Sequence, residues 1–282
     1  APINDKHNNN RMSYLDSVSI VSSFGDRAYI GMEEDEKYDG VISSFISDSD
    51  RILEYREKIA DAKLDNGRLL YICDPDFAKN GEKYASVTDK HIANYKKLME
   101  VSDIITPNFT EAIMLTDMEY DENSQKYSII KYENDTKEKA DKTSKKIIES
   151  MFPLLDKIRF KKNQITVITG IELYNAVLTI LDIYDGDHGR RQTSCNYAEK
   201  VESRTGVGDV FDAMFFETST NGLSLNDALI ASTSFVNSAL RYSRDYKIDE
   251  KLGVFFEPII HSNINLIRKK IEEKKKKDVK GV

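Results

Sequence analysis

The stretch RTGVGDVFDAMFF, residues 204–216, decides how the fold of this chain is interpreted. Two glycines, Gly206 and Gly208, come just before Asp209 and an apolar pattern with helical spacing. One interpretation is an ordinary helix start, since glycine suits a turn and a carboxylate in the first turn suits the helix dipole. The other is an anion site, where backbone N–H groups converge on a phosphate beside Asp209. The segment alone favours the first interpretation and leaves the second open.

The composition is typical of a soluble globular protein. The 282 residues suffice for one large α/β domain or two small ones, and 40% are hydrophobic and 32% charged. A net charge of −7 argues against general nucleic-acid binding, which needs a basic face. Cys73 and Cys195 lie far apart and indicate neither a disulfide framework nor a zinc site. Without a long apolar run or a signal-peptide core, we expect a cytoplasmic protein with no membrane partner.

Strand-like and helix-like segments alternate along most of the chain. Short apolar segments predict strands, and apolar residues at helical spacing predict helices. The predicted strands are 18–21, 40–43, 68–73, 103–106, 164–170 and 175–184, with a hairpin turn at 185–189; the predicted helices are one ending near Met151 and those at 50–63, 89–100, 109–116, 210–218, 225–241 and 258–277. Uniformly apolar strands that alternate with helices indicate an α/β fold, doubly wound, with a mostly parallel sheet covered on both faces.

Polar stretches frame and interrupt the predicted domain. We expect residues 1–13 to form a disordered tail and residues 269–282 a lysine-rich tail. A single domain is expected to occupy residues 14–268. Within it, residues 119–138 are rich in Asn, Lys, Glu and Asp, and predict a polar surface insertion.

The connection between the first two predicted strands is unusually short. Parallel neighbours need a crossover of about a dozen residues or more, usually with a helix. Between 18–21 and 40–43 the sequence contains turn glycines and acids but no convincing helical pattern. Either these strands are not ordinary sequential neighbours, or a segment is missing near residues 32–38.

Four polar clusters follow predicted strands: CDPD at 73–76, TPNFTEA at 106–112, TG at 169–170 and TGVGD at 205–209. Each cluster has an ordinary structural explanation, such as a turn, a helix cap or a strand exit. Ligands of open α/β sheets, however, bind beyond the carboxyl ends of the strands. Four clusters at one sheet edge therefore favour a binding site. The sequence lacks the lysine phosphate-loop motif, HExxH and GxSxG, which would have indicated other enzyme classes.

The clusters also carry a family resemblance. YICDPDFAKNGEKYA, DIITPNFTEAIML, VITG and GVGDVFDAMF, in this order, resemble the pyridoxal kinases of the ribokinase-like superfamily. The resemblance spans about residues 17–260 and is most specific at 103–112 and 206–213. Hydroxymethylpyrimidine kinases share much of the pattern. The implied activity is ATP-dependent phosphorylation of the 5′-hydroxymethyl group of pyridoxal, pyridoxine or pyridoxamine.

The resemblance implies that the GVGD segment performs the phosphoryl transfer. Gly206, Val207 and Gly208 would form the anion hole, and Asp209 would contact the substrate and take the proton from its hydroxyl group. The resemblance thus favours the anion site over a plain helix start. Hydroxymethylpyrimidine kinase activity is the alternative within the enzymes. A catalytically impaired, nucleotide-binding relative is the alternative of another class.

The remaining clusters receive roles from the same resemblance. The implied nucleotide-binding residues are Asp74, Asn108, Thr169 and Gly170, the implied metal residues are Asp74 and Glu111, and the implied substrate-side residues are Ser22 and Phe45. Mg²⁺ is expected because it bridges and neutralises the phosphate oxygens. The family also suggests K⁺ as a second cation and a homodimer as the assembly.

The chain departs from the family pattern at several places. Val207 replaces a threonine, so a hydroxyl is lost although the backbone donors remain. Lys79 replaces an acid near the metal, where Asp76 could compensate, and we hypothesise that Lys79 partly substitutes for the monovalent cation. The family's substrate-side TGY reads Ser43-Ser44-Phe45, and several dozen family residues have no counterpart near 32–38.

Overall fold

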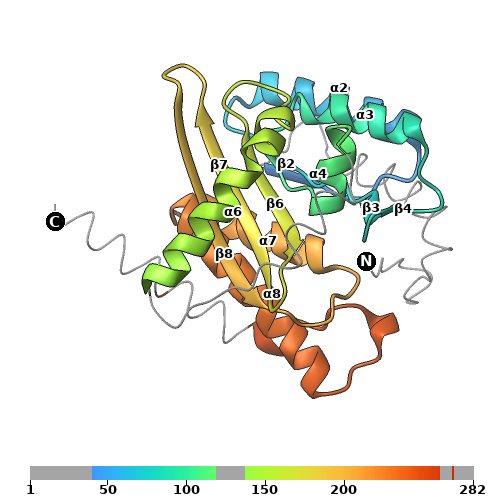
Figure 1. Ribbon diagram of the computed structural model, residues 1–282. Coiled ribbons are helices and arrows are strands. Elements are labelled where there is room, and N and C mark those ends of the chain that lie inside the picture. The colour runs from blue at the N-terminus through green and yellow to red at the C-terminus, as the bar shows by residue number, and fades with distance from the viewer. Residues whose placement is uncertain (1–39, 119–136, 261–268, 270–282) are drawn as a thin grey trace.

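The structure is a computed structural model that describes residues 40–118, 137–260 and 269 (Figure 1). Several predictions concern residues outside this part: the tail at 1–13, the strand at 18–21, Ser22, the short crossover near 32–38, most of the insertion at 119–138, most of the helix at 258–277, and the lysine-rich tail beyond residue 269. Across the described residues, no helix combines the length and apolar character needed to cross a membrane.

Six strands form a central sheet in the order β1-β2-β5-β6-β7-β8. Their bounds are β1 Gly40–Ser43, β2 Leu70–Cys73, β5 Ile104–Ile105, β6 Ile165–Glu172, β7 Ala176–Asp185 and β8 Arg190–Glu199. Strands β1, β2, β5 and β6 run parallel, whereas β6–β7 and β7–β8 are antiparallel. The predicted hairpin turn joins β7 to β8. The mostly parallel α/β sheet is therefore confirmed, with a long hairpin at one edge (Figure 1).

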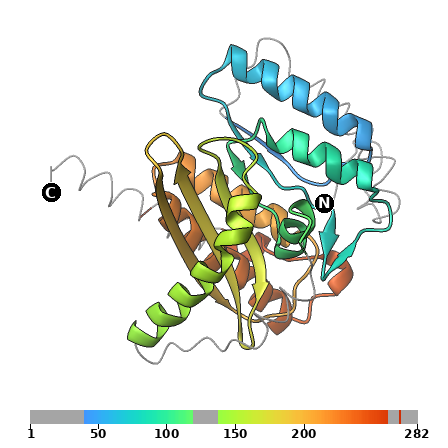
Figure 2. The same cartoon turned by 45° about the horizontal axis from the view of Figure 1, so that its top comes forward.

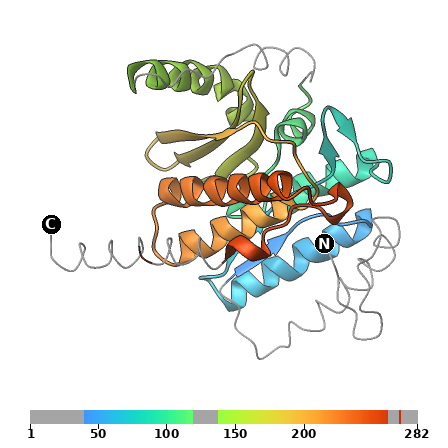
Figure 3. The ribbon, with the colours of Figure 1, turned by 90° about the horizontal axis from the view of Figure 1, so that it is seen from below.

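Helices cover both faces of this sheet. Their bounds are α2 Ser49–Asp65, α3 Asp89–Met99, α4 Phe109–Leu115, α6 Lys137–Lys157, α7 Val207–Thr220 and α8 Leu225–Asp245, followed by a 3₁₀ turn, η1, at Glu250–Leu252. Figure 3 shows α6 on the opposite side of the sheet from α7 and α8. Alternate strand residues divide between the two cores: Tyr71 and Cys73 pack with α2, α3, α4 and α6, whereas Ile72 packs with α7 and α8. The doubly wound arrangement follows from this alternation.

Helix α6 differs from its predicted extent. The expectation that it ends near Met151 is wrong, because the helix continues through Pro153. Beyond the proline, Leu154 and Leu155 are buried in the same core as the rest of the helix, so the apolar stripe continues across it. The start of α6 also takes up the last residues of the insertion expected at 119–138.

A small hairpin stands apart from the main sheet. Strands β3 (Ala78–Lys79) and β4 (Glu82–Lys83) pair antiparallel around Asn80 and Gly81, both of which have positive φ. An Asn-Gly pair in this conformation is the preferred two-residue hairpin connection. The hairpin is short, and Figure 2 shows it at the end of the molecule where the loop before α7 also lies.

Candidate functional site

The polar clusters meet where the parallel strands end. The backbone N–H of Asp74, just after β2, donates to the carbonyl of Ser43 at the end of β1 (2.9 Å). The N–H of Thr106, just after β5, donates to the carbonyl of Cys73 (3.1 Å). The strand ladders therefore continue into the clusters and fix their spacing. This places the clusters at one sheet edge, as the sequence predicted.

Helix α7 begins at this edge with an uncapped N-terminus. Gly206 is the N-cap residue, has a φ of 85° that favours glycine, and provides no side-chain cap. The first-turn N–H groups are thus left for another acceptor. A Cβ atom at Gly208 would lie 3.0 Å from Oδ2 of Asp74, so the bare glycine lets that carboxyl approach the helix. Asp209, in the first turn, is exposed.

Glu111 holds the backbone of the neighbouring loops. Its Oε1 accepts from the N–H groups of Phe77 (2.8 Å) and Ala78 (3.2 Å), and its Oε2 accepts from the N–H of Asn108 (2.8 Å). The side chain of Asn108 completes a capping box, since its Oδ1 accepts from the N–H of Glu111 (3.1 Å). Glu111 is fully buried, and both of its oxygens are already engaged by the protein. A metal would therefore meet Glu111 more readily through water than directly.

Thr169 and Gly170 lie beside Asn108. The N–H of Thr169 donates to the carbonyl of Pro107 (3.1 Å), and Thr169 forms an isolated parallel bridge with Asn108. The interpretation of this pair as a strand exit is wrong, because β6 continues beyond it to Glu172. The pair falls at an irregularity in the pairing of β6 with β7, and Gly170 has a φ of 69°. Because of this irregularity, the exposed Gly170 lies at the edge of the sheet where the polar clusters meet.

Phe45 and the β3–β4 hairpin border the same edge. Phe45 lies two residues beyond β1, and its ring meets that of Tyr84 edge-on, with centroids 6.3 Å apart. The hydroxyl of Tyr84 donates to Oδ1 of Asp76 (2.8 Å). The ammonium of Lys79 donates to Oγ of Ser203 in the loop before α7 (3.0 Å). Lys79 therefore links the hairpin to the loop, and it does not project freely into water.

Five carboxyl groups gather at this edge: Asp74, Asp76, Glu111, Asp209 and Asp212. Burial, followed by the charge of Asp212, raises the pKa of Asp74 well above its ordinary value. Burial and the charge of Asp76 raise the pKa of Glu111 to about 8, against the effect of its three N–H donors. Burial also raises the pKa of Asp76 and, strongly, that of Asp212. A cation or a cation-bound polyphosphate at this point would favour the ionised form of these carboxyl groups.

Sequence reasoning missed Asp212 and Thr106. Asp212 is only 1% exposed, and neither of its carboxyl oxygens has a well-formed hydrogen bond within the described residues. The buried Oγ1 of Thr106 is in the same situation. The signal for Asp212 was present, since it interrupts the apolar face of α7 between Phe211 and Phe215. Thr106 belongs to a cluster that was recognised, but it received no role.

The many side-chain oxygen atoms at this edge of the sheet fit a magnesium ion, although the side chains alone do not form a complete coordination site. In the described part of the chain, no three His, Cys, Asp or Glu side chains are already arranged to hold a metal ion. Mg²⁺ needs fewer protein ligands than that, because it commonly uses one or two carboxylates and takes the rest from water and phosphate. Buried oxygens without hydrogen-bond partners at Thr106 and Asp212 are the kind of donor it would satisfy.

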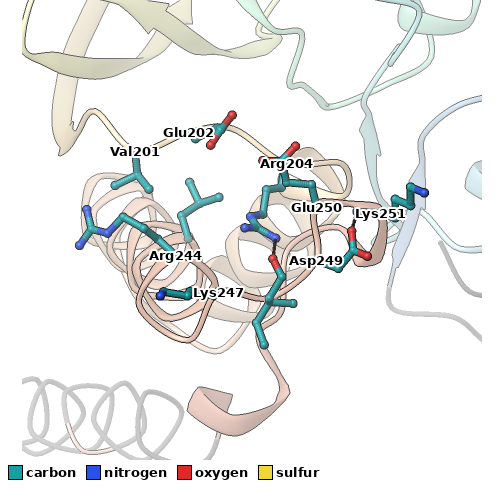
Figure 4. Close-up of a pocket in the computed structure, with 10 residues that line it drawn as sticks. Val201, Glu202, Arg204, Arg244, Lys247, Asp249, Glu250 and Lys251 are labelled. Carbon is teal, nitrogen blue, oxygen red and sulfur yellow. Dashed lines mark hydrogen bonds between the residues drawn. The ribbon is translucent and has the colours of Figure 1, made fainter.

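A cavity of about 520 Å³ adjoins the loop before α7 (Figure 4). Its lining mixes cations and anions, including Arg204, Arg244, Lys247 and Asp249. The guanidinium of Arg204 donates to the carbonyl of Ile248 (2.9 Å) and so joins the two walls. Arg204, which lines the cavity, comes two residues before the N-cap of α7 in the sequence. Val201, Leu240 and Ile248 also line the cavity, so it suits a ligand with both polar and apolar parts.

Comparisons with known proteins agree with this architecture. The chain is 36% identical over 83 residues to pyridoxal kinase of Ovis aries, covering 28% of this chain and 27% of the sheep protein. The aligned segment thus spans only about a quarter of that relative.

Two solved structures share the fold. One is a Bacteroides thetaiotaomicron protein assigned as a phosphomethylpyrimidine kinase and crystallised with pyridoxal (TM-score 0.63, 20% identity, 88% of this chain and 77% of that chain). The other is pyridoxal kinase from Leishmania donovani in complex with ADP and ginkgotoxin (TM-score 0.58, 16% identity, 84% and 70%). At such low identity, the likeness concerns the fold, which is ribokinase-like.

The family follows from a longer match. Residues 53–254 fit the phosphomethylpyrimidine kinase family, and this span includes β2, β5, β6 and the whole of α7. It contains every candidate site residue named above except Phe45 and Ser22. Because the match covers well over half of the sequence and the fold agrees, the chain belongs to the phosphomethylpyrimidine kinase family.

Proposed function

We propose that this protein transfers the γ-phosphoryl group of ATP to the 5′-hydroxymethyl group of a vitamin B6 compound, as a pyridoxal kinase. The observation that carries the proposal is the start of α7. There backbone N–H groups without a side-chain cap, an exposed Asp209 and the buried Asp74 carboxyl come together. Phosphoryl transfer depends mainly on positioning and on stabilising charge, and this arrangement offers both.

Asp209 acts in this proposal as the base. It stands in the first turn of α7, where it is exposed and able to meet a substrate hydroxyl, and it can accept the proton as the hydroxyl oxygen attacks. The N–H groups of residues 206–208 hold the transferring phosphoryl oxygens through the backbone. The loss of the threonine hydroxyl at Val207 therefore leaves this function in place.

The nucleotide lies along the adjoining edge. Asn108 uses its Oδ1 for the helix cap and one amide hydrogen for the carbonyl of Ala78 (2.7 Å), which leaves one amide hydrogen for a phosphate. Thr169 and Gly170 border the same strand end, and the cavity beside Arg204, with its mixed polar and apolar lining, would take the nucleoside. Phe45 would contact the B6 ring from the other side of Asp74.

Further parts of the proposal rest on the resemblance alone. Mg²⁺, when bound, would neutralise the phosphate oxygens, with Asp74 as a ligand and Glu111 reached through water. A monovalent-cation site in which Lys79 partly takes the place of K⁺, a homodimeric assembly and a cytoplasmic location belong to the same proposal.

The test is a comparison of substrates. ATP consumption is measured with pyridoxal, with hydroxymethylpyrimidine and with neither, for the wild type and for Asp209→Asn. We expect turnover with pyridoxal that Asp209→Asn removes and that Glu217→Gln, an exposed change in the same helix, leaves intact. Turnover with hydroxymethylpyrimidine alone would replace the proposal by the pyrimidine kinase activity, which the family description favours. Nucleotide binding without turnover on either compound would indicate an impaired relative.

A further inference from the structure

Three buried polar side chains of α3 have no part in the proposed chemistry. They are His91, Asn94 and Tyr95. Burying a polar group is costly unless it is hydrogen-bonded, and all three direct their polar atoms to residues 44–49, the segment that leads from β1 into α2. Figure 1 shows α3 beside α2. The segment contains Phe45, the residue proposed to contact the ring of the substrate.

The hydroxyl of Tyr95 holds the backbone on both sides of Phe45. It accepts from the N–H of Ile46 (2.8 Å) and donates to the carbonyl of Ser44 (3.3 Å). Residues 44–48 belong to neither a helix nor a strand, so the backbone groups here find partners in side chains. Burial raises the pKa of Tyr95 well above its ordinary value, so the hydroxyl keeps the proton that it donates.

His91 and Asn94 hold the rest of the segment. Nδ1 of His91 accepts from the N–H of Thr88 (3.1 Å), which leaves Nε2 to donate to the carbonyl of Ser47 (3.0 Å). The side-chain amide of Asn94 donates to the carbonyl of Ser49 (2.8 Å). One helix therefore binds the backbone of this segment at both its ends and its middle, and fixes its path.

The ring of Phe45 is held as well. It meets the ring of Tyr84 edge-on, with centroids 6.3 Å apart, and it is partly buried against the core that α3 also joins. A phenyl group has no polar atom, so it can recognise a planar ring only by contact and shape. Such contact is sensitive to displacements of about 1 Å, and the position of the Phe45 backbone is therefore decisive.

We propose that Tyr95 is a positioning residue: its hydroxyl holds Phe45 where the aromatic ring of the substrate packs, and thereby sets the affinity for that ring. The inference rests on the proposed function, which assigns Phe45 to the substrate side, and it deepens it by naming a residue behind the site that controls substrate binding. The ring of Tyr95 packs against Phe77, with centroids 5.9 Å apart. Tyr95→Phe keeps this contact, so it tests the hydroxyl alone.

The first experiment measures KM and kcat with pyridoxine, which lacks the aldehyde that reacts with lysine side chains. Tyr95→Phe should raise KM for pyridoxine about fivefold or more, because the N–H of Ile46 loses its acceptor and Phe45 is released. Contact with the ring is the same in the ground and transition states, so kcat should stay near the wild-type value, and so should KM for ATP. The matched control is Tyr197→Phe, which removes a hydroxyl that donates to Ser144 (3.1 Å) and should change neither KM.

A double-mutant cycle separates positioning from a general structural role. Phe45→Leu should raise KM for pyridoxine by itself. If Tyr95 acts through Phe45, adding Tyr95→Phe to Phe45→Leu should raise KM by no more than about twofold further. Fully additive effects would overturn the inference.

Hydrogen exchange of the ligand-free protein provides a readout that needs no substrate. Exchange of the Ile46 amide should be about tenfold faster or more in Tyr95→Phe, and unchanged in Tyr197→Phe. Unchanged exchange in Tyr95→Phe would overturn the inference, whether or not the protein phosphorylates a B6 compound.

Two kinetic results would also overturn it: an unchanged KM for pyridoxine in Tyr95→Phe, or an equal rise in KM for ATP. If Tyr95→Phe fails to fold, His91→Gln takes its place, because glutamine can preserve the capping box with Thr88 and loses the contact with Ser47. An unchanged KM for pyridoxine in that variant would count equally against the inference. A wild type that phosphorylates only hydroxymethylpyrimidine would refute the B6 activity alone, and the same comparison of KM values would then use that ring.

Discussion

Replacing Glu111 by glutamine should change how the stability of the protein depends on pH. In the native state, burial and then the Asp76 charge raise the pKa of Glu111 to about 8, from an ordinary value of 4.5. Between these two values, the native carboxyl keeps its proton and the unfolded one has lost it. Unfolding therefore releases a proton in this range, and the free energy of unfolding falls as the pH rises from 4.5 towards 8.

The size of the effect follows from the width of this range. It spans about 3.5 pH units, and each unit is worth about 1.4 kcal/mol, so Glu111 accounts for at most about 5 kcal/mol. The three backbone N–H groups that donate to its oxygens favour the carboxylate and act against the shift. Glutamine cannot titrate, so Glu111→Gln should flatten the curve by up to about 1.4 kcal/mol per pH unit.

Urea unfolding between about pH 5 and pH 8 measures this slope. The variant will also lose hydrogen bonding, because an amide NH₂ cannot accept from the N–H of Asn108. That loss lowers the free energy of unfolding at every pH and leaves its slope against pH unchanged. Glu217→Gln, an exposed change, should leave the wild-type slope unchanged. Parallel curves for the wild type and Glu111→Gln would refute the reasoning, since they would mean that Glu111 is ionised in the native state throughout this range.

The remaining predictions concern single side chains. Asp209→Asn should lower turnover by a factor on the order of 10² or more with nucleotide affinity nearly unchanged, and near-normal turnover would return Asp209 to a helix-start role. Lys79→Asp should introduce activation by K⁺ that the wild type lacks; an identical K⁺ titration for both would make Lys79 a bystander. Asp182→Ala leaves Arg159 and Arg191 without their buried partner and should cost about 3–5 kcal/mol in chemical unfolding; a loss below about 1 kcal/mol would contradict this.

The sheet and the position of the site were predictable because both depend on local patterns. Apolar strands with alternate residues directed to two cores give a sheet covered on both sides, and polar residues directly after such strands must gather at its carboxyl edge. Asp74, Asn108 and Glu111 were found in this way. The extent of α6 was not, because the burial of Leu154 and Leu155 outweighs the usual effect of Pro153, and burial is a tertiary property.

The orientation of individual charges could not be read from the sequence. Lys79 was expected to take the place of a cation, yet it stands in a hairpin with a two-residue Asn-Gly connection, and its ammonium donates to Ser203, more than a hundred residues away in sequence. For Asp212, the burial could be predicted from the sequence but the neighbouring residues could not. Its spacing from Phe211 and Phe215 put it on the buried side of α7, but only the fold shows that this side meets Asp74 and Thr106. A carboxyl that breaks an apolar helical face three residues beyond a GVGD segment therefore needs polar neighbours from elsewhere in the fold, and only the structure shows which residues these are.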